Sequence, residues 1–330
     1  PDEVMGLIDV AAHYKIDRFH LHLTDDQGWR IEILSWPDLT GIGGSVEIGE
    51  GEGGYYTQAE YAAIVEYAAA RHVTVVPEID MPGHCTAALA SYGELNESGE
   101  PADPFEHAGI SDNSLWIEDN ITLTFLEDVL GEVAALTPGP YLHIGGDEAQ
   151  GTDDDDYGWF VRDVQEIVDG LDKTLIGWDE IATAPLATPV LTQYWDDEEN
   201  ALDAVAQGAQ IIASPAEYAY LDMVYDKHSH VGTFWAGPTD VRDGYEWDPV
   251  SVGLLESDVV GLEAALWTET VAVIDDVEFL VFPRLLGYAE IGWSPAEGRA
   301  WEEYRVRLAA HGPRMQHWRL DYYESPLVEW

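Results

Sequence analysis

Hydrophobic and polar positions alternate between two periods along the whole chain. Apolar residues recur at helical spacing over residues 4–14, and residues 17–24 then alternate strictly between apolar and polar side chains, as in a half-buried strand. The same succession repeats along the sequence. The pattern predicts helices over 4–14, 58–71, 121–136, 163–169, 201–207 and 279–291, and strands over 17–24, 73–79, 141–144, 174–178, 190–194, 209–213 and 259–266.

Seven strands alternating with helical segments predict a parallel sheet joined by helical crossovers. Functional residues of (β/α)8 barrels lie at the carboxyl ends of the strands, and we expect a TIM-type (β/α)8 barrel here. No segment resembles a linker, so residues 1–330 are expected to form a single catalytic barrel domain without a separate second domain. The eighth strand would precede Pro1. The side chains at the predicted strand ends are Asp25, Asp26, Asp80, His84, Asp147, Glu148, Trp178, Trp195 and Trp267.

Four segments fall outside this alternation. Residues 37–56 are rich in glycine, and residues 94–115 have neither period, so both are predicted to be long loops. The run Asp153-Asp154-Asp155-Asp156 is predicted to be a solvated loop, with a calcium site as the alternative. Residues 231–248 form an insertion rich in aromatic side chains, and its sequence leaves open whether it is a lid over a ligand or core packing.

The charge of the chain is far from neutral. It carries 64 acidic residues against 14 lysines and arginines, which gives a formal net charge of −50. Repulsion of this size weakens a compact state in dilute buffer, but molar salt screens it within about 3 Å. The acids are spread along the whole sequence, so we expect adaptation to molar salt, as in a halophilic organism. Such a surface would repel phosphates, and nucleic acid is not an expected partner.

Cysteine content and hydropathy exclude two other classes. A single cysteine, Cys85, cannot build an intrachain disulfide framework. No apolar run is long enough to span a bilayer, and no membrane partner is expected. The chain opens at Pro1 in helical sequence without a targeting signal, so it is expected to lack its native N-terminus. Compartment and oligomeric state are left open.

The acid pair Asp147-Glu148 is the leading candidate for chemistry. It follows the short apolar run 141–144 and two glycines, Gly145 and Gly146. Glycines allow a sharp turn and the close approach of a ligand, and a strand end is where a barrel enzyme keeps its reactive groups. A solvated acidic loop is the ordinary alternative in so acidic a chain. The other side chains at strand ends favour a site.

Tryptophans point to a carbohydrate ligand. The chain has 13 of them, and Trp178, Trp195 and Trp267 each stand at or just after a strand end with an acid within two residues. Sugar rings present apolar faces that stack on indole, while their hydroxyls need polar partners. Core packing is the alternative for any single tryptophan. The three placements together favour a sugar pocket.

Six segments, spaced by whole strand-helix units, resemble family 20 glycoside hydrolases, the β-N-acetylhexosaminidases. They cover nearly the whole chain in order, and their number makes the resemblance strong although each motif alone is common. The segments are His20-Leu21-His22-Leu23-Thr24-Asp25-Asp26 with its continuation to residue 30, residues 77–84, His143 to Glu148, Gly177-Trp178-Asp179-Glu180, Tyr220-Leu221-Asp222, and Ala265 to Glu269.

The resemblance implies an exo-acting enzyme that removes terminal N-acetylglucosamine or N-acetylgalactosamine with retention of configuration. Glu148 would protonate the glycosidic oxygen and later activate water. Asp147 would hold the N–H of the substrate's 2-acetamido group, whose carbonyl would attack the anomeric carbon and form an oxazolinium intermediate. Family 20 is a substrate-assisted exception to the scheme of two opposed carboxylates. No cofactor and no metal are implied.

The same resemblance assigns further residues. His84 and Asp25 would form a relay to Glu148. The family motif contains both Asp25 and Asp26, and the relay is assigned to the first of them. A histidine after Pro-Gly could instead cap a helix. The substrate contacts would be Trp178, Trp195 and Trp267 as pocket walls, Tyr220 on the acetamido oxygen, and Asp222 and Glu269 on sugar hydroxyls.

One family feature has no counterpart in the sequence. The first barrel strand of the family carries an arginine that grips the terminal sugar, and this strand is expected to lie before Pro1. Arg18 and Arg30 do not occupy the matching position. Activity of the chain without that strand is therefore an open question.

Two rival functions remain from the residues alone. A metal-dependent hydrolase could use His20, His22, Asp25 and Asp80, and chelator sensitivity would support it. A barrel remnant could bind N-acetylated sugars without cleaving them. An acyl hydrolase is disfavoured because the sequence has no Gly-x-Ser-x-Gly motif. The residues do not separate the two N-acetylhexosamines or identify the natural glycan.

Overall fold

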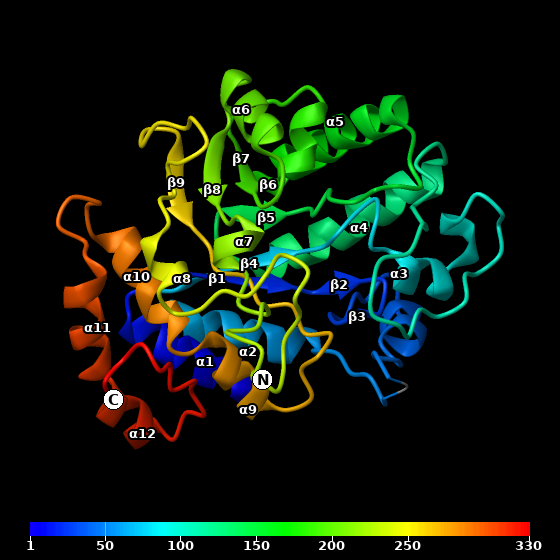
Figure 1. The fold of residues 1–330 in the computed structure, drawn as a ribbon. Helices are drawn as coiled ribbons and strands as arrows, with labels where there is room; N and C mark the ends of the chain where they lie inside the picture. Colours follow the sequence, from blue (N-terminus) through cyan, green and yellow to red (C-terminus); the bar gives the residue numbers. More distant parts are fainter. Residues whose placement is uncertain (50) are drawn as a thin grey trace. The chain divides into compact units, whose positions relative to one another are not determined.

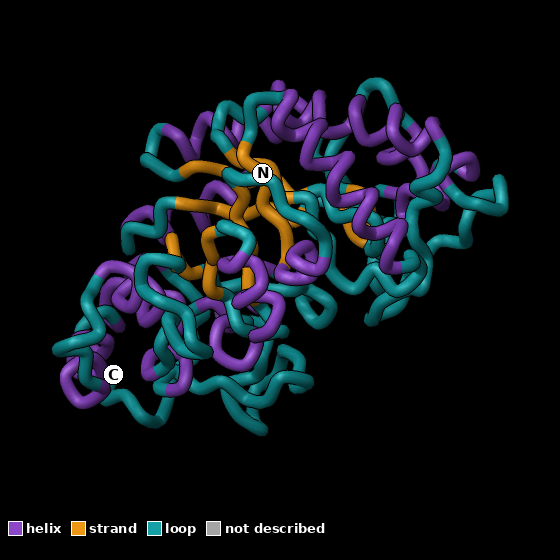
Figure 2. The backbone as a smooth tube through the Cα atoms, turned by 90° about the horizontal axis from the view of Figure 1, so that it is seen from above, coloured by secondary structure: helices purple, strands orange, loops and turns teal. Residues whose placement is uncertain are grey.

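The computed structural model describes residues 1–49 and 51–330 (Figure 1). Contacts between residues divide the chain into two compact units. The first unit comprises Pro1–Gln193 and Glu199–Gln210, and the second comprises Tyr194–Glu198 and Ile211–Trp330. Strands are short, and loops make up much of the backbone (Figure 2). None of the described helices is both long and apolar enough to cross a membrane.

Parallel strands form the sheet of the first unit. Its order is β1 (Arg18–His22), β4 (Thr74–Glu78), β5 (Tyr141–His143), β6 (Thr174–Trp178) and β7 (Val190–Tyr194), so strands that follow in sequence are neighbours in space. The register sets His22 beside Glu78 and Glu78 beside His143. Parallel pairing therefore brings polar residues from three strands to one level near their carboxyl ends.

Helices between these strands pack on the sheet and on one another. α2 (Gln58–Ala69) lies against β4, α5 (Asp154–Gly170) lies against β6, and α1 (Asp2–His13), α2, α4 (Asn120–Leu136) and α5 contact one another in chain order. α2 begins with a capping box in which Thr57 and Glu60 bond reciprocally. α6 (Glu198–Ala206) follows β7. These are the helical crossovers that the sequence pattern predicts.

Short elements follow the strand ends, where loops are long. A hairpin of β2 (Thr24–Asp25) and β3 (Gly28–Trp29) comes after β1. The remaining ones are the π-helix η1 (Leu39–Gly43), α3 (Thr86–Ser91), and the 3₁₀-helices η2 (Gly93–Leu95) and η3 (Asp179–Thr183). They position the side chains of the candidate site.

The second unit contains the parallel pair β8 (Gln210–Ala213) and β9 (Val259–Leu262). Its helices are α7 (Ala216–Ala219), α8 (Asp243–Glu246), α9 (Ile274–Val281), α10 (Arg284–Trp293), α11 (Trp301–Ala309) and α12 (Gly312–Trp318). A buried cation, Arg284, holds this unit together: its guanidinium donates to the backbone carbonyls of Leu221, Met223, Thr239 and Leu280. Such a hydrogen-bonded buried charge fixes the loops that it joins.

Several sequence-based predictions of element bounds are wrong, and the helix expected over 163–169 begins nine residues earlier, at Asp154. Asp154, Asp155 and Asp156 form the first turn of α5 rather than a loop, where negative charge is favourable at the positive end of the helix dipole. The helix expected over 279–291 is two helices, because Pro283 lacks the N–H that a continuous helix needs. The last strand ends at Leu262 rather than at residue 266.

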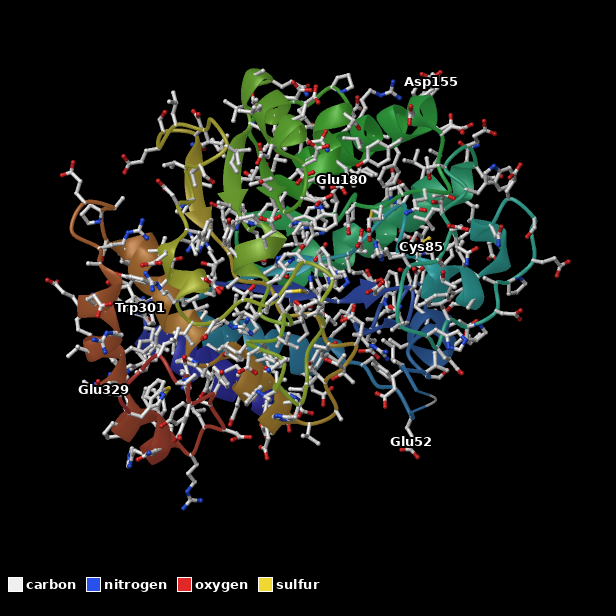
Figure 3. All side chains as sticks on the ribbon, in the orientation of Figure 1. Glu52, Cys85, Asp155, Glu180, Trp301 and Glu329 are labelled. Atoms are coloured by element: carbon white, nitrogen blue, oxygen red, sulfur yellow. The ribbon has the colours of Figure 1, made fainter. Side chains whose placement is uncertain are left out.

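Acidic side chains are mostly solvated. Glu52, Asp155 and Glu329 are exposed at the periphery of the structure, whereas Cys85 is buried (Figure 3). The buried carboxylates of the described residues are Asp26, Glu78, Asp80, Asp147, Asp179 and Asp222. Burying a charge without partners is costly, so these few acids mark places where the fold supplies specific partners.

Candidate active site

A tight turn after β5 presents the acid pair. Gly145 and Gly146 have φ of +67° and +101°, a region that side chains with a Cβ rarely adopt. A Cβ on Gly145 would also lie 1.7 Å from Oδ1 of Asp80. Glu148 itself has φ of +48°, an uncommon backbone state for a residue other than glycine. The two glycines are therefore required by the geometry that places Asp147 and Glu148.

The imidazole of His84 lies among three of the predicted catalytic carboxylates. Its Nδ1 is 3.0 Å from Oδ1 of Asp25, and its Nε2 is 3.4 Å from Oδ2 of Asp147 and 3.3 Å from Oε2 of Glu148. The N-cap of α3 is Cys85, without a side-chain cap bond. The ring of His84 therefore contacts carboxylates rather than capping the helix that follows it.

Electrostatics favours the charged forms in this relay. Burial opposes charge on Asp25, but hydrogen bonds from His22 and His84 hold the pKa of Asp25 well below its usual range. Burial likewise opposes charge on His84, but the carboxyl groups of Asp80 and Asp147 and its hydrogen bonds raise the pKa of His84 far above its ordinary value. The relay is thus an aspartate and an imidazolium directed at the acid pair.

Asp26, next to Asp25, has a different environment. Its Oδ1 accepts from the backbone N–H of Thr86 at 3.1 Å and from the hydroxyl of Ser111 at 2.9 Å, and its Oδ2 accepts from the N–H of Ser111 at 2.8 Å. The distance from Oδ2 to Nδ1 of His84 is 4.0 Å. Asp26 therefore fastens the start of α3 to the loop at Ser111, while Asp25 makes the closer contact with His84.

Asp80 hydrogen-bonds to the backbone of the glycine turn that precedes Asp147. Its Oδ1 accepts from the N–H of Gly146 at 3.2 Å, and its backbone N–H donates to the hydroxyl of Thr24 at 2.9 Å. Burial, and then the negative charge of Asp147, raise the pKa of Asp80 well above its ordinary value. Asp80 therefore joins the turn at Gly146 to Thr24 in surroundings that disfavour its charged form.

Trp178 ends β6 and is fully buried. Its indole N–H donates to Oε1 of Glu78 at 2.9 Å, so the ring orientation is fixed by a buried carboxylate. Indole N–H groups normally find such a partner when buried. Glu78 was not singled out by the sequence, because one glutamate among 64 acidic residues carries no local signal.

Three of the aromatic residues predicted for a sugar pocket, Trp195, Tyr220 and Trp267, lie together in the second unit. Trp195 and Tyr220 are stacked with ring centroids 6.2 Å apart, and Trp267 lies 6.0 Å from Tyr220. Trp235, from the insertion at 231–248, lies 5.9 Å from Tyr220 and is largely exposed. The insertion therefore adds the ring of Trp235 to the aromatic residues predicted for the pocket. The sequence showed that the insertion is rich in aromatic residues but did not assign Trp235 to the pocket.

Asp222 is a buried acid beside these rings. Its Oδ2 accepts from the hydroxyl of Thr233 at 2.8 Å, and burial together with the negative charge of Glu269 raises the pKa of Asp222 to about 6. Glu269 is exposed. Arg284 holds the carbonyls of Leu221 and Met223, on both sides of Asp222, and is a positioning residue that no local sequence pattern reveals.

The metal hypothesis requires His20, His22, Asp25 and Asp80 to converge. Groups of histidines and acids close enough to share an ion do occur among the described residues, but none of these groups unites those four. His20 and His22 instead contact Glu78 at 2.9 Å and 2.7 Å. These are hydrogen-bonding distances, which proton sharing between imidazole and carboxylate accounts for.

Comparisons with known proteins agree on one family. The chain matches the sequence model described as glycosyl hydrolase family 20, catalytic domain, over residues 1–155 and 152–296. A β-N-acetylhexosaminidase of Cellulomonas fimi is 40% identical over 334 residues, which cover 100% of this chain and 67% of that protein.

Solved structures show the same likeness. A family 20 β-N-acetylhexosaminidase from Streptomyces coelicolor A3(2) has a TM-score of 0.96 at 47% identity, covering 100% of this chain and 68% of that one. A mutant Streptomyces plicatus β-hexosaminidase in complex with product (GlcNAc) has a TM-score of 0.97 at 48% identity, with the same coverage of 100% and 68%. The predicted barrel fold class is confirmed by these matches.

Proposed function

Because the chain belongs to glycosyl hydrolase family 20, we propose that it is an exo-acting β-N-acetylhexosaminidase that removes terminal β-linked N-acetylglucosamine or N-acetylgalactosamine with retention of configuration. The observation that carries the proposal is the strand-end turn that presents Asp147 and Glu148 beside the imidazole of His84. The substrate would be an oligosaccharide or glycoconjugate that ends in an N-acetylhexosamine.

Glu148 would act as the general acid. It gives a proton to the glycosidic oxygen as the bond to the leaving group breaks, and its carboxylate later takes a proton from the attacking water. Between these steps the positive ring of His84, 3.3 Å away, stabilises the carboxylate that forms. Glu148 is partly exposed, so it can reach both substrate and water.

Asp147 would orient the nucleophile, which belongs to the substrate. Its carboxylate accepts the N–H of the 2-acetamido group, directs the carbonyl oxygen toward the anomeric carbon, and stabilises the positive charge on nitrogen as the oxazolinium ring closes. The glycine turn and the nearby ring of His84 fix the position of the Asp147 carboxylate. Asp147 therefore needs to move little while the oxazolinium ring closes.

Substrate binding would use aromatic and polar side chains. Aromatic rings would pack on the sugar ring and acetamido methyl, and polar groups would take hydroxyls and the acetamido oxygen. The residues proposed for these contacts are Trp178, Trp195 and Trp267 as pocket walls, Tyr220 on the acetamido oxygen, and Asp222 and Glu269 on hydroxyls. The ionised form of Asp222 is the better acceptor, and a pKa near 6 leaves Asp222 ionised at neutral pH.

We further propose that the protein is adapted to molar salt. The support is the formal charge of −50 together with the concentration of buried acids at the candidate site, which leaves the other acids on the surface. Assays are therefore designed in molar potassium chloride.

Hydrolysis of an aryl β-N-acetylglucosaminide, compared with the matching aryl β-glucoside in 2 M potassium chloride, tests the activity. We expect turnover of the acetamido sugar only, because the glucoside lacks the internal nucleophile. Equal turnover of both sugars would contradict substrate assistance. A folded chain that binds N-acetylglucosamine without cleaving the aryl glycoside would instead support the binding-remnant function.

A further inference from the structure

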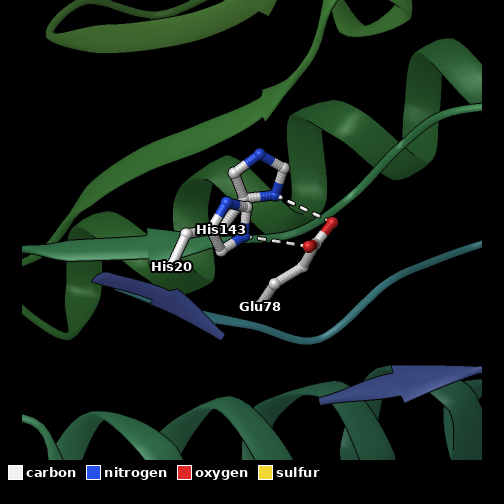
Figure 4. A group of neighbouring side chains, drawn as sticks. All are labelled: His20, Glu78 and His143. Atoms are coloured by element: carbon white, nitrogen blue, oxygen red, sulfur yellow. Dashed lines mark ion pairs between the residues drawn. The ribbon is translucent and has the colours of Figure 1, made fainter. Parts of the chain in front are cut away.

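Glu78 is a fully buried carboxylate with four polar neighbours. Its Oε2 lies 2.9 Å from Nε2 of His20 and 2.7 Å from Nδ1 of His22, and its Oε1 lies 3.2 Å from Nδ1 of His143 and 2.9 Å from the indole nitrogen of Trp178. Figure 4 shows the rings of His20 and His143 converging on this one carboxylate. None of these residues has a role in the mechanism above apart from Trp178.

The strand pattern explains why these groups meet. His20 and His22 are two residues apart on β1 and therefore project from the same face. The register places His22 beside Glu78 on β4 and Glu78 beside His143 on β5. The cluster is thus built into the sheet, which makes it a rigid support for the loops that follow these strands.

A chain of contacts leads from Glu78 to the acid pair. Nδ1 of His22 contacts Glu78, and Nε2 of His22 lies 3.5 Å from Oδ2 of Asp25. Asp25 contacts Nδ1 of His84, whose Nε2 faces Glu148. Carboxyl groups and imidazole rings therefore alternate along the chain of contacts. When the two rings are protonated, each ring lies between two acids.

The charges within this chain are mutually supporting. Burial opposes charge on Glu78, but His143, His22 and His20 hold the pKa of Glu78 well below its ordinary value. Burial also opposes charge on His22, but Glu78 and Asp25 raise the pKa of His22 well above its ordinary value. Buried networks of this kind fix one arrangement of their members when every group is paired.

The backbone of the catalytic turn bonds to His143, another neighbour of Glu78. The N–H of Gly145 donates to Nδ1 of His143 at 3.0 Å, the same nitrogen that contacts Glu78. Gly145 is the residue at which the backbone turns toward Asp147 and Glu148. Because Nδ1 of His143 accepts the N–H of Gly145, it has no proton to donate to Glu78, so Glu78 reaches the acid pair through His22.

We propose that Glu78 and His22 are positioning residues for the general acid, holding Asp25 and His84 in the arrangement in which His84 faces Glu148. This inference rests on the proposed hexosaminidase activity. Without the charge of Glu78, the protonated form of His22 is less favoured, Asp25 loses support from one of its two imidazole neighbours, and His84 is held less firmly as an imidazolium. The carboxylate that Glu148 becomes on giving up its proton is then less stabilised.

The test compares Glu78→Gln and His22→Asn with the unmodified chain on two aryl β-N-acetylglucosaminides. A phenyl leaving group needs protonation, whereas a 2,4-dinitrophenyl leaving group departs without it. We expect kcat for the phenyl glycoside to fall about tenfold or more, with KM changed little and with a much smaller loss on the dinitrophenyl glycoside. The pH profile of the phenyl reaction is expected to shift.

His20→Gln is the matched control. It removes a second histidine from the same oxygen of Glu78 but leaves the contact between His22 and Asp25 in place. We expect the ratio of the phenyl rate to the dinitrophenyl rate in this variant to equal that of the unmodified chain. Equal losses on both glycosides in Glu78→Gln and His22→Asn, or the same ratio change in His20→Gln, would overturn the inference.

Histidine nitrogen NMR without substrate separates this inference from the proposed activity. We expect the ring of His22 to stay doubly protonated to a higher pH than a free imidazole does, and the resonances of His22 and His84 to shift in Glu78→Gln. Unchanged ring resonances would overturn the inference whether or not the chain turns over. A chain with the expected shifts but no turnover would refute the activity alone.

Discussion

Replacing Glu148 with glutamine is expected to lower kcat/KM for a phenyl β-N-acetylglucosaminide about 10²- to 10⁴-fold, the range that a positioned general acid contributes. Glutamine has the same shape and can adopt the same left-handed backbone, so the fold is expected to persist. What it lacks is an acidic proton for the leaving oxygen. Initial rates in 2 M potassium chloride measure the effect.

The leaving group identifies the step that is lost. In Glu148→Gln the dinitrophenyl glycoside is expected to lose much less activity than the phenyl glycoside, because its departure needs no proton. Glu127→Gln, an exposed site on α4, serves as the control and is expected to leave both rates unchanged. Full phenyl activity in Glu148→Gln, with the variant free of unmodified protein, would remove Glu148 from its proposed role.

Lowering the salt concentration is expected to destabilise the fold strongly. A formal charge of −50 on 330 residues gives extensive repulsion, and the screening length grows from about 3 Å at 1 M to about 10 Å at 0.1 M salt. We expect Tm to rise by about 10 °C or more between 0.1 M and 2 M potassium chloride, which corresponds to a few kcal/mol in a chain of this size.

Circular dichroism at a series of salt concentrations measures this change. Sucrose serves as the control, since it favours compact states by exclusion without screening charge. We expect sucrose at low salt to recover only part of the stability. A Tm that is the same at 0.1 M and 2 M potassium chloride would show that the surface charge is tolerated without salt, and the proposed adaptation would be wrong.

The sequence predicted the strands and helices of the first unit because apolar residues recur with a different period in each type of element. The glycine turn and the acid pair after β5 were also visible locally, since a strand, two glycines and two acids are adjacent in sequence. The pairing of His84 with Asp25 came from the family resemblance, and the structure places their side chains 3.0 Å apart.

The supporting residues could not be predicted in the same way. Glu78 lies between strands that are far apart in sequence, and its importance arises only from the parallel register that brings His22 and His143 beside it. Arg284 is comparable, because its partners are backbone carbonyls of distant loops, which carry no side-chain signature. Such contacts depend on tertiary structure, whereas periodicity reports only on neighbours along the chain.

The most direct test of substrate assistance is the rate of cleavage across aryl glycosides whose 2-acetamido group carries no, one, two or three fluorine atoms. Fluorine withdraws electrons from the carbonyl and weakens it as a nucleophile, while the leaving group stays the same. We predict that kcat/KM falls at each step, by more than about tenfold over the series, or more than about 1.4 kcal/mol in activation free energy. Rates that are independent of fluorine content would show that the acetamido group is not the nucleophile.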